Sequence, residues 1–292
     1  MQATLLRGVD LLWQSAVTGF YFTKSDLKTT LVPITCFAIA AAPMTELSRL
    51  PHIMFWIWIH LLQFDVSNQT LEPEEDMVNK GDRPIPSGRM TFRDALILRW
   101  LLIPTCFIYS AMYSIETFYA SVSLVAFTVI YNEMAAHAGH FIVRNVVNAA
   151  GFASFEAGAT LVAGSDPHIL DGIAVLSICC SAGIFATTIQ AQDFKDEHGD
   201  RMIGRQTIPI VLPSIARYTV IVPLLLWSGG LSMTWHLNPL ISTAFLSLAL
   251  FVGTRFLKYK SVPADQVSFY WYNVWLSIAH SLPGYYRMYR QV

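Results

Sequence analysis

Two charged segments could carry out chemistry in a chain that is otherwise mostly hydrocarbon. The first covers residues 68–88, reads NQTLEPEEDMVNKGDRPIPSG, and closely follows the apolar run 53–64. Its residues Asn68, Glu72 and Asp76 stand four apart, so in a helix they project from one face on successive turns. Mg²⁺ prefers such oxygen ligands and completes its coordination shell with water and phosphate oxygens. The spacing therefore predicts a metal ion that bridges to a diphosphate.

The second segment, residues 190–201, reads QAQDFKDEHGDR and again follows an apolar run. Asp193, Asp196 and Asp200 stand at i, i+3 and i+7, which is also one helical face. Basic residues accompany both segments and are suitable partners for diphosphate oxygens: Lys80, Arg83, Lys195, Arg201 and Arg205. Either segment alone is equally well explained as a solvated charged loop. Because both segments occur, and each is followed by basic residues and proline, we predict that the two segments bind one substrate between them.

The composition indicates a protein embedded in a lipid bilayer. Of its 292 residues, 54% are hydrophobic and 13% are charged, and the mean hydropathy is +0.45, whereas soluble domains carry about a quarter charged residues. The net charge of −1 provides no basic field for nucleic acid, so we expect no nucleic-acid partner. Nothing indicates an obligate protein partner. No long Gly/Ser linker divides the chain, so we predict a single membrane domain over residues 1–292.

Apolar runs of roughly the length that crosses a bilayer predict nine transmembrane helices. They cover residues 30–44, 51–67, 95–113, 118–135, 146–164, 169–191, 210–231, 239–254 and 267–282. With the N-terminus in the cytosol, most of the 19 lysines and arginines and both acidic segments fall on the cytosolic side. We therefore expect a multi-pass protein of the endoplasmic reticulum whose site faces the cytosol. Residues 1–29 have apolar positions at helical spacing, which predicts a cytosolic amphipathic segment, although a packed helix explains them equally well.

Four polar residues inside the predicted spans need an explanation, because ionisable groups are costly in hydrocarbon. They are Asn132, Glu133, Asn148 and Glu156. Glu156 either faces a cavity or hydrogen-bonds to a neighbouring helix. Asn132 and Glu133 lie near the cytosolic end of a span, where we expect access to solvent. Aromatic rings within the spans could stabilise a cation through their faces, although membrane packing explains any single ring better.

The two charged segments resemble the motifs of the UbiA superfamily of intramembrane prenyltransferases. The first is similar to the family pattern NQxxDxxxDxxNKPxRPxxSG, with matches at Asn68, Gln69, Asp76, Asn79, Lys80, Arg83, Pro84, Ser87 and Gly88. The second, residues 193–209, is similar to the pattern DxxDxxGDxxxGxxTxP. The resemblance implies an all-α integral membrane fold with nine transmembrane helices around a central cavity. It also implies Mg²⁺ held by both acidic segments and ionisation of an allylic prenyl diphosphate.

Two departures from the family patterns narrow the resemblance to the UbiA-type membrane terpene cyclases. Glu72 replaces the usual aspartate, and the loop after the fourth predicted span reads His137-Ala-Gly-His140-Phe-Ile-Val-Arg144 in place of the Lys-Arg pair common in members with aromatic acceptors. The resemblance then implies a class I cyclase that converts farnesyl or geranylgeranyl diphosphate to a cyclic hydrocarbon and releases diphosphate. Its implied catalytic and Mg²⁺ ligands are Asn68, Glu72, Asp76, Asp193, Asp196 and Asp200, and its diphosphate-binding residues are Lys80, Arg83, Lys195 and Arg201.

Two other functions are also compatible with the sequence. A UbiA-type prenyltransferase would share the ionisation step and pass the prenyl group to an aromatic acceptor. A cation transporter would also carry carboxylates, but near the midplane of broken helices, whereas here they lie at the ends of apolar runs beside arginine and lysine.

Overall fold

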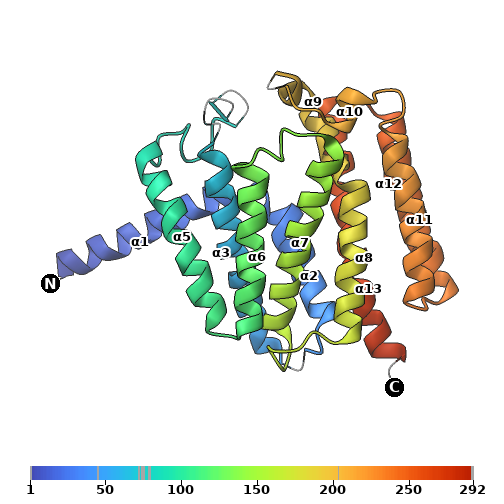
Figure 1. Ribbon diagram of the computed structural model, residues 1–292, viewed down its shortest axis with the longest axis horizontal. Coiled ribbons are helices and arrows are strands. Elements are labelled where there is room, and N and C mark those ends of the chain that lie inside the picture. Colours follow the sequence, from blue (N-terminus) through green and yellow to red (C-terminus); the bar gives the residue numbers. More distant parts are fainter. Residues whose placement is uncertain are drawn as a thin grey trace.

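The computed structural model describes residues 2–290, except residues 45, 72, 74, 75, 78, 79 and 203. In this part of the chain every named element is a helix, which confirms the predicted all-α class (Figure 1). The elements are α1 (Gln2–Thr23), η1 (Leu27–Leu31), α2 (Val32–Ala41), η2 (Leu47–Arg49), α3 (Leu50–Gln69), α5 (Phe92–Ala111), α6 (Ile115–Asn132), α7 (Phe141–Ala163), α8 (Gly172–Thr188), η3 (Ile189–Gln192), α9 (Asp193–Met202), α10 (Ile208–Val211), α11 (Tyr218–Thr234), α12 (Pro239–Lys258) and α13 (Val262–Arg290).

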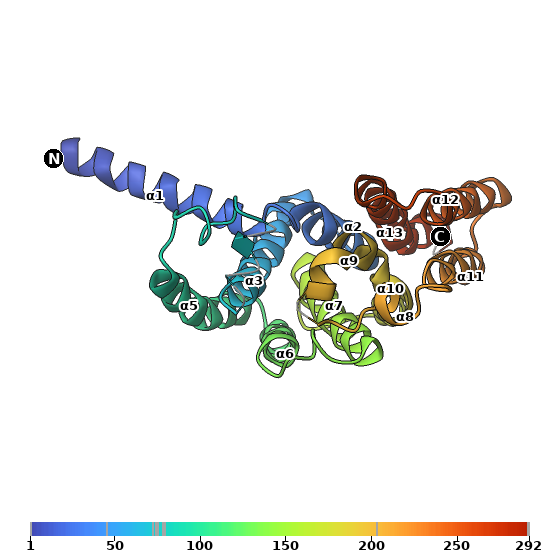
Figure 2. The same ribbon diagram turned by 90° about the horizontal axis from the view of Figure 1, so that it is seen from above.

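Helices that are neighbours in the sequence also pack against one another in the bundle. The pairs α3 with α5, α5 with α6, α6 with α7, α7 with α8 and α11 with α12 are in contact, and α13 returns to pack against α2. The last helix therefore closes the bundle against one of the first. The N-terminal part of α1 extends away from the bundle in both views (Figure 2).

A helix overlaps each of the nine predicted spans, but not all of these helices have the apolar character of a bilayer span. Within the described ranges, five are long and apolar enough to cross a membrane: 92–111, 115–132, 141–163, 172–202 and 239–258. α3 and α13 do not qualify. Both carry polar residues that line an internal cavity, such as Asp65 and Asn273, and these lower the hydropathy of their helices. The count of nine transmembrane helices stays a prediction.

Large apolar side chains on the outside of the bundle are suited to contact with lipid. Trp100 and Ile108 on α5, and Leu240 and Leu250 on α12, are all exposed. Exposing apolar surfaces of this kind to water is unfavourable, whereas contact with the hydrocarbon of a bilayer is not. Helices also satisfy their own backbone hydrogen bonds, which a membrane interior requires.

A close approach between α3 and α7 holds the first half of the bundle together. Gly158 on α7 packs against the indole of Trp56, and a β-carbon built on Gly158 would lie 2.2 Å from the nearest ring carbon. Trp56 is completely buried, and its Nε1 donates a hydrogen bond of 2.9 Å to Ser110 Oγ on α5. One tryptophan therefore connects three helices.

Glu156 hydrogen-bonds to a neighbouring helix and does not face the cavity. Ser181 Oγ on α8 donates a hydrogen bond of 2.5 Å to Glu156 Oε1, and the Glu156 side chain is fully buried. It is not among the residues that line the cavity described below. The hydrogen bond to a neighbouring helix therefore accounts for its position.

The contact at Gly158 leads to a stability prediction. We expect Gly158→Ala to lower the apparent melting temperature of the detergent-purified protein, corresponding to about 1–3 kcal/mol, because the new methyl group must displace Trp56. Gly229→Ala on α11 is a suitable control, since nothing lies within 4 Å of its added β-carbon. Equal melting temperatures for the two variants would contradict the proposed steric origin.

Candidate active site

A cavity of about 560 Å³ lies among α3, α6, α7, α8 and α13 and is charged at one end. Its charged wall includes Lys24, Asp26, Lys28, Asp65, Lys80, Asp82, Arg83, Arg144, Lys195, Asp196 and Arg205. Farther along the same helices it is lined by apolar and aromatic residues, among them Leu61, Leu124, Phe127, Phe152, Phe155, Phe185 and Leu276. Phe152 and Phe185 stack with ring centroids 3.9 Å apart. The cavity can therefore bind a molecule with an anionic head and a hydrocarbon tail.

The first acidic segment forms a buried ion pair at this charged end. Arg83 Nη1 donates hydrogen bonds of 2.7 and 2.8 Å to the two carboxylate oxygens of Asp76, and both side chains are buried. Asn68 also lines the cavity, and its Nδ2 donates to Asn132 Oδ1 over 3.2 Å. The predicted ligand Glu72 and the motif residue Asn79 lie outside the described residues.

The expectation that solvent access explains Asn132 is wrong. Asn132 is buried, and its Nδ2 donates a hydrogen bond of 3.1 Å to Ser67 Oγ. Together with its bond to Asn68, this contact links the end of α6 to the end of α3. Glu133, the next residue, is half-exposed and pairs with Arg99. Asn132 therefore helps to hold the first segment in place.

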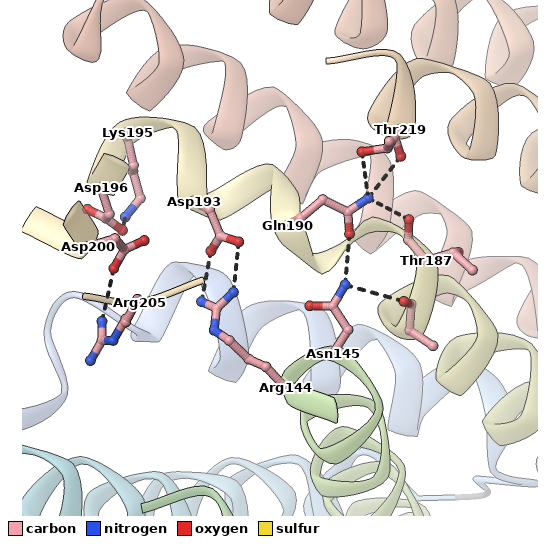
Figure 3. Close-up of polar contacts among 11 residues, drawn as sticks. Arg144, Asn145, Thr187, Gln190, Asp193, Lys195, Asp196, Asp200, Arg205 and Thr219 are labelled. Carbon is pink, nitrogen blue, oxygen red and sulfur yellow. Dashed lines mark hydrogen bonds and ion pairs between the residues drawn. The ribbon is translucent and has the colours of Figure 1, made fainter. Parts of the chain in front are cut away.

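The second acidic segment is anchored by an arginine from another helix (Figure 3). Arg144 Nη1 donates to Asp193 Oδ2 over 2.7 Å, and its Nη2 donates to Asp193 Oδ1 over 2.8 Å. Both side chains are buried, and the paired contacts match the planar guanidinium to the carboxylate. The start of α7 is thereby fixed against the start of α9.

The other two aspartates of the second segment each have a basic partner. Arg205 Nη1 donates to Asp200 Oδ1 over 3.1 Å, and Lys195 pairs with its neighbour Asp196. Gly204 has a φ of +73°, a conformation that glycine adopts readily. The chain turns back there, and the backbone N–H of Arg205 donates to the carbonyl of Asp200 over 2.9 Å.

Neighbouring polar contacts hold Arg144 in position. Asn145 Nδ2 donates to Gln190 Oε1 over 3.2 Å, and Gln190 Nε2 donates to the carbonyl of Thr219 over 2.9 Å. The loop before α7 also forms an isolated parallel β-bridge between His140 and Gln206. These contacts join α7, η3 and α11, so the position of Arg144 is set by three parts of the chain (Figure 3).

The structure brings most of the predicted site residues together. Asn68, Lys80, Arg83, Lys195 and Asp196 line the one cavity, and Asp193 and Asp200 bind arginines that line it. A smaller space of about 50 Å³ adjoins this region and is lined by Asn68, Leu71, Asp76, Lys80, Arg83, His137 and Arg205. Residues of both acidic segments therefore meet at one site.

Among the predicted site residues with described positions, Arg201 lies apart from the cavity. Its side chain is 51% exposed and forms a hydrogen bond of 2.8 Å to Glu197, one helical turn earlier on α9. It does not line the cavity. Its role in diphosphate binding stays a prediction.

The turn after α1 and the following η1 contribute residues that the motifs did not indicate. Lys24 pairs with Asp82 from the first charged segment, and Lys28 Nζ donates to Tyr270 Oη on α13 over 2.7 Å. The hydrogen bond from Lys24 holds the pKa of Asp82 below its ordinary value. Gln69 Nε2 on α3 donates to the carbonyl of Phe22 over 2.9 Å and so fixes the end of α1 against the bundle. The end of the N-terminal segment is therefore part of the cavity wall, while the surface location of residues 1–29 stays a prediction.

The donors at the charged end suit a divalent cation in their chemistry. Among the residues with described positions, no three carboxylates, imidazoles or thiols stand close enough together to hold a metal ion. The carboxylates of Asp76 and Asp193 are instead held by arginines. However, Asp200 Oδ2 is buried and has no hydrogen-bond partner, and amide and carboxylate oxygens are the ligands that Mg²⁺ prefers. The residues therefore fit Mg²⁺.

The fold and the site define a class of protein. It is an all-helical membrane protein in which two acidic helix ends lie at the charged end of an apolar cavity. The model of the UbiA prenyltransferase family matches residues 30–276, and the chain belongs to this family. It is a multi-pass integral membrane enzyme of the terpene cyclase and prenyltransferase class.

Individual relatives agree with this membership. The chain is 32% identical over 274 residues to the fumagillin beta-trans-bergamotene synthase of Aspergillus fumigatus, covering 93% of each protein. It is 27% identical to a diterpene cyclase of Hericium erinaceus, covering 87% of this chain and 83% of the relative. The structure of a UbiA homolog from Archaeoglobus fulgidus bound to DMAPP and Mg²⁺ has a TM-score of 0.70 at 12% identity and covers 92% of this chain and 98% of that chain. That likeness confirms the UbiA-like helical fold.

The buried pair between Arg144 and Asp193 leads to a second stability prediction. We expect Arg144→Gln to destabilise the protein by about 3–5 kcal/mol, because it leaves the Asp193 carboxylate buried without its partner. Arg201→Gln removes the exposed pair with Glu197 and should change stability by at most about 1 kcal/mol. Thermal unfolding followed by tryptophan fluorescence compares the two variants, and a larger loss for Arg201→Gln would contradict the prediction.

Proposed function

We propose that this protein is a Mg²⁺-dependent class I terpene cyclase. It ionises farnesyl or geranylgeranyl diphosphate, cyclises the resulting allylic cation, and forms a hydrocarbon when the cyclic cation loses a proton, so diphosphate and one proton are released. The observation that carries the proposal is the single cavity whose charged end receives residues of both acidic segments and whose remaining wall is apolar and aromatic. The similarity to a bergamotene synthase along 93% of the chain supports cyclisation.

The charged end of the cavity would hold the diphosphate and its metal ions. We assign the Mg²⁺ ligands to Asn68, Glu72, Asp76, Asp193, Asp196 and Asp200. When bound, Mg²⁺ neutralises charge that develops on the departing diphosphate. Lys80, Arg83 and Lys195 add positive charge beside the same oxygens. Arg201 joins them by leaving Glu197, which costs little because exposed ion pairs are weak.

The apolar part of the cavity would fold the prenyl chain and exclude water. The rings of Phe127, Phe152, Phe155 and Phe185 line it, and aromatic faces stabilise a nearby cation. The cation is then attacked by a double bond of its own chain, because the wall excludes competing water. The structure of the cavity thus favours an intramolecular nucleophile.

The location of the enzyme is also a proposal. We infer that residues 1–292 form one membrane domain of the endoplasmic reticulum with the charged end of the cavity facing the cytosol. The lysines and arginines around that end support this orientation.

Incubation with substrate alone tests cyclisation. Purified protein with Mg²⁺ and either farnesyl or geranylgeranyl diphosphate should yield a cyclic hydrocarbon in a hexane extract analysed by gas chromatography and mass spectrometry. The alternative, transfer of the prenyl group to an aromatic acceptor, shares the ionisation step. If no product forms until a phenol or an aromatic acid is added, the enzyme is a transferase and the cyclase proposal fails.

Removing a proposed ligand tests the assignment of the acidic segments. We expect Asp76→Ala and Asp193→Ala each to lower turnover by at least about a hundredfold, because the diphosphate charge is no longer neutralised. Both variants should still insert into the membrane and purify, with Asp193→Ala less stable than the unaltered chain because Arg144 loses its buried partner. The matched control is Asp166→Asn, an aspartate in the loop between α7 and α8, which should leave turnover unchanged. Full activity in both alanine variants would remove the metal assignment.

A further inference from the structure

A carboxylate outside both motifs has one oxygen buried without a partner. Asp65 lies on α3 three residues before Asn68, is 3% exposed and lines the cavity. Its Oδ2 atom is buried and has no hydrogen-bond partner. Leaving a buried carboxylate oxygen in this state is costly, so such an oxygen requires a ligand or a proton.

An acidic neighbour of Asp65 comes from a distant part of the chain. Asp26, in the turn between α1 and η1, also lines the cavity, and its side chain lies within hydrogen-bonding distance of Asp65. Asp26 Oδ2 accepts a hydrogen bond of 2.9 Å from Ser25 Oγ, and Asp26 Oδ1 accepts one of 3.4 Å from Thr29 Oγ1. Each of two neighbouring carboxylates disfavours the charged form of the other unless a cation lies between them. They therefore share either a proton or a metal ion.

The surroundings of the pair favour a metal ion. Arg83 and Lys80 both act electrostatically on Asp65, but neither donates a hydrogen bond to its Oδ2 atom, and Arg83 donates instead to both oxygens of Asp76. Asp65 also lies one helical turn before Asn68, on the same face of α3. It therefore extends the row of oxygen ligands of the first segment toward the apolar part of the cavity. Mg²⁺ commonly uses only one or two protein carboxylates and takes its other ligands from water and phosphate. Two carboxylates at the wall of a diphosphate cavity match that requirement.

We propose that Asp65 and Asp26 together bind a divalent cation at the cavity wall, in addition to the ligands of the two motifs. This inference rests on the proposed function, since the cation would be shared with the substrate diphosphate. It gives the turn at residues 24–26 a specific role, because cation binding ties this turn to α3 at the cavity wall. The two carboxylates come from positions 39 residues apart, so no motif in either segment could indicate the pair.

Metal binding without turnover tests the pair directly. The 292-residue chain in detergent is dialysed against increasing Mn²⁺, and bound Mn²⁺ is counted per chain by mass spectrometry. We expect Asp65→Asn and Asp26→Asn each to weaken the binding of one ion at least roughly tenfold, and the double variant to bind no more weakly than either single variant. Asp65→Asn that binds Mn²⁺ within about twofold of the unaltered chain would overturn the inference and indicate a shared proton.

Two further variants separate this inference from the proposed function. Asp166→Asn, in the loop between α7 and α8, should leave Mn²⁺ binding unchanged and controls for the loss of one acidic side chain. Asp200→Asn alters the second motif instead. Loss of Mn²⁺ binding in Asp200→Asn but not in Asp65→Asn means that the additional site is absent while the metal-dependent function stands. An unaltered chain that binds no Mn²⁺ overturns both.

Discussion

The site depends on the neutralisation of carboxylates that lie out of water at the end of a largely apolar bundle. Asp193 is held by Arg144, and Asp76 is held by Arg83, with all four side chains buried. A charge in such a place is tolerated only when it is paired and hydrogen-bonded. The ion pairs therefore allow acidic helix ends to stand directly beside a chamber lined by phenylalanine.

These pairs also explain how the site can be both stable and ready to bind. Each aspartate is compensated by a basic group from the protein, and each basic group is a suitable partner for a diphosphate oxygen. An incoming anion with its metal ions would offer both members of a pair a new partner of opposite charge. Exchange of partners then conserves the charge balance of the buried region, whereas binding to unpaired carboxylates would first require the site to hold uncompensated charge.

The sequence predicts the helices from local apolar patterns, and it predicts the meeting of the two acidic segments because two such segments occur and resemble a pair of family motifs. Apolar runs show where helices form, and the motif spacing places Asp193, Asp196 and Asp200 on one short helix. Contacts between distant positions have no such local signal. Arg144 is 49 residues from Asp193, and Asn132 lies 64 residues from Asn68, so their pairing depends on how the helices pack. The exposed position of Arg201 likewise depends on which face of α9 turns toward the cavity.

A second buried polar cluster lies beyond the aromatic part of the cavity, and its chemistry differs from that of the charged end. Glu156 accepts a hydrogen bond from Ser181, whose Oγ is also 3.0 Å from His280 Nε2. His280 Nδ1 in turn lies 3.2 Å from the carbonyl of Pro33. This cluster links α7, α8, α13 and α2. It contains no lysine or arginine, so it has no basic side chain that could leave a carboxylate to bind an anionic ligand. The aromatic chamber therefore lies between a polar region that fixes the helices in place and an ionic region that can change partners. Because only the ionic end can accept an anion without leaving a buried charge unpaired, a molecule with an anionic head and a hydrocarbon tail has one favourable orientation in the cavity.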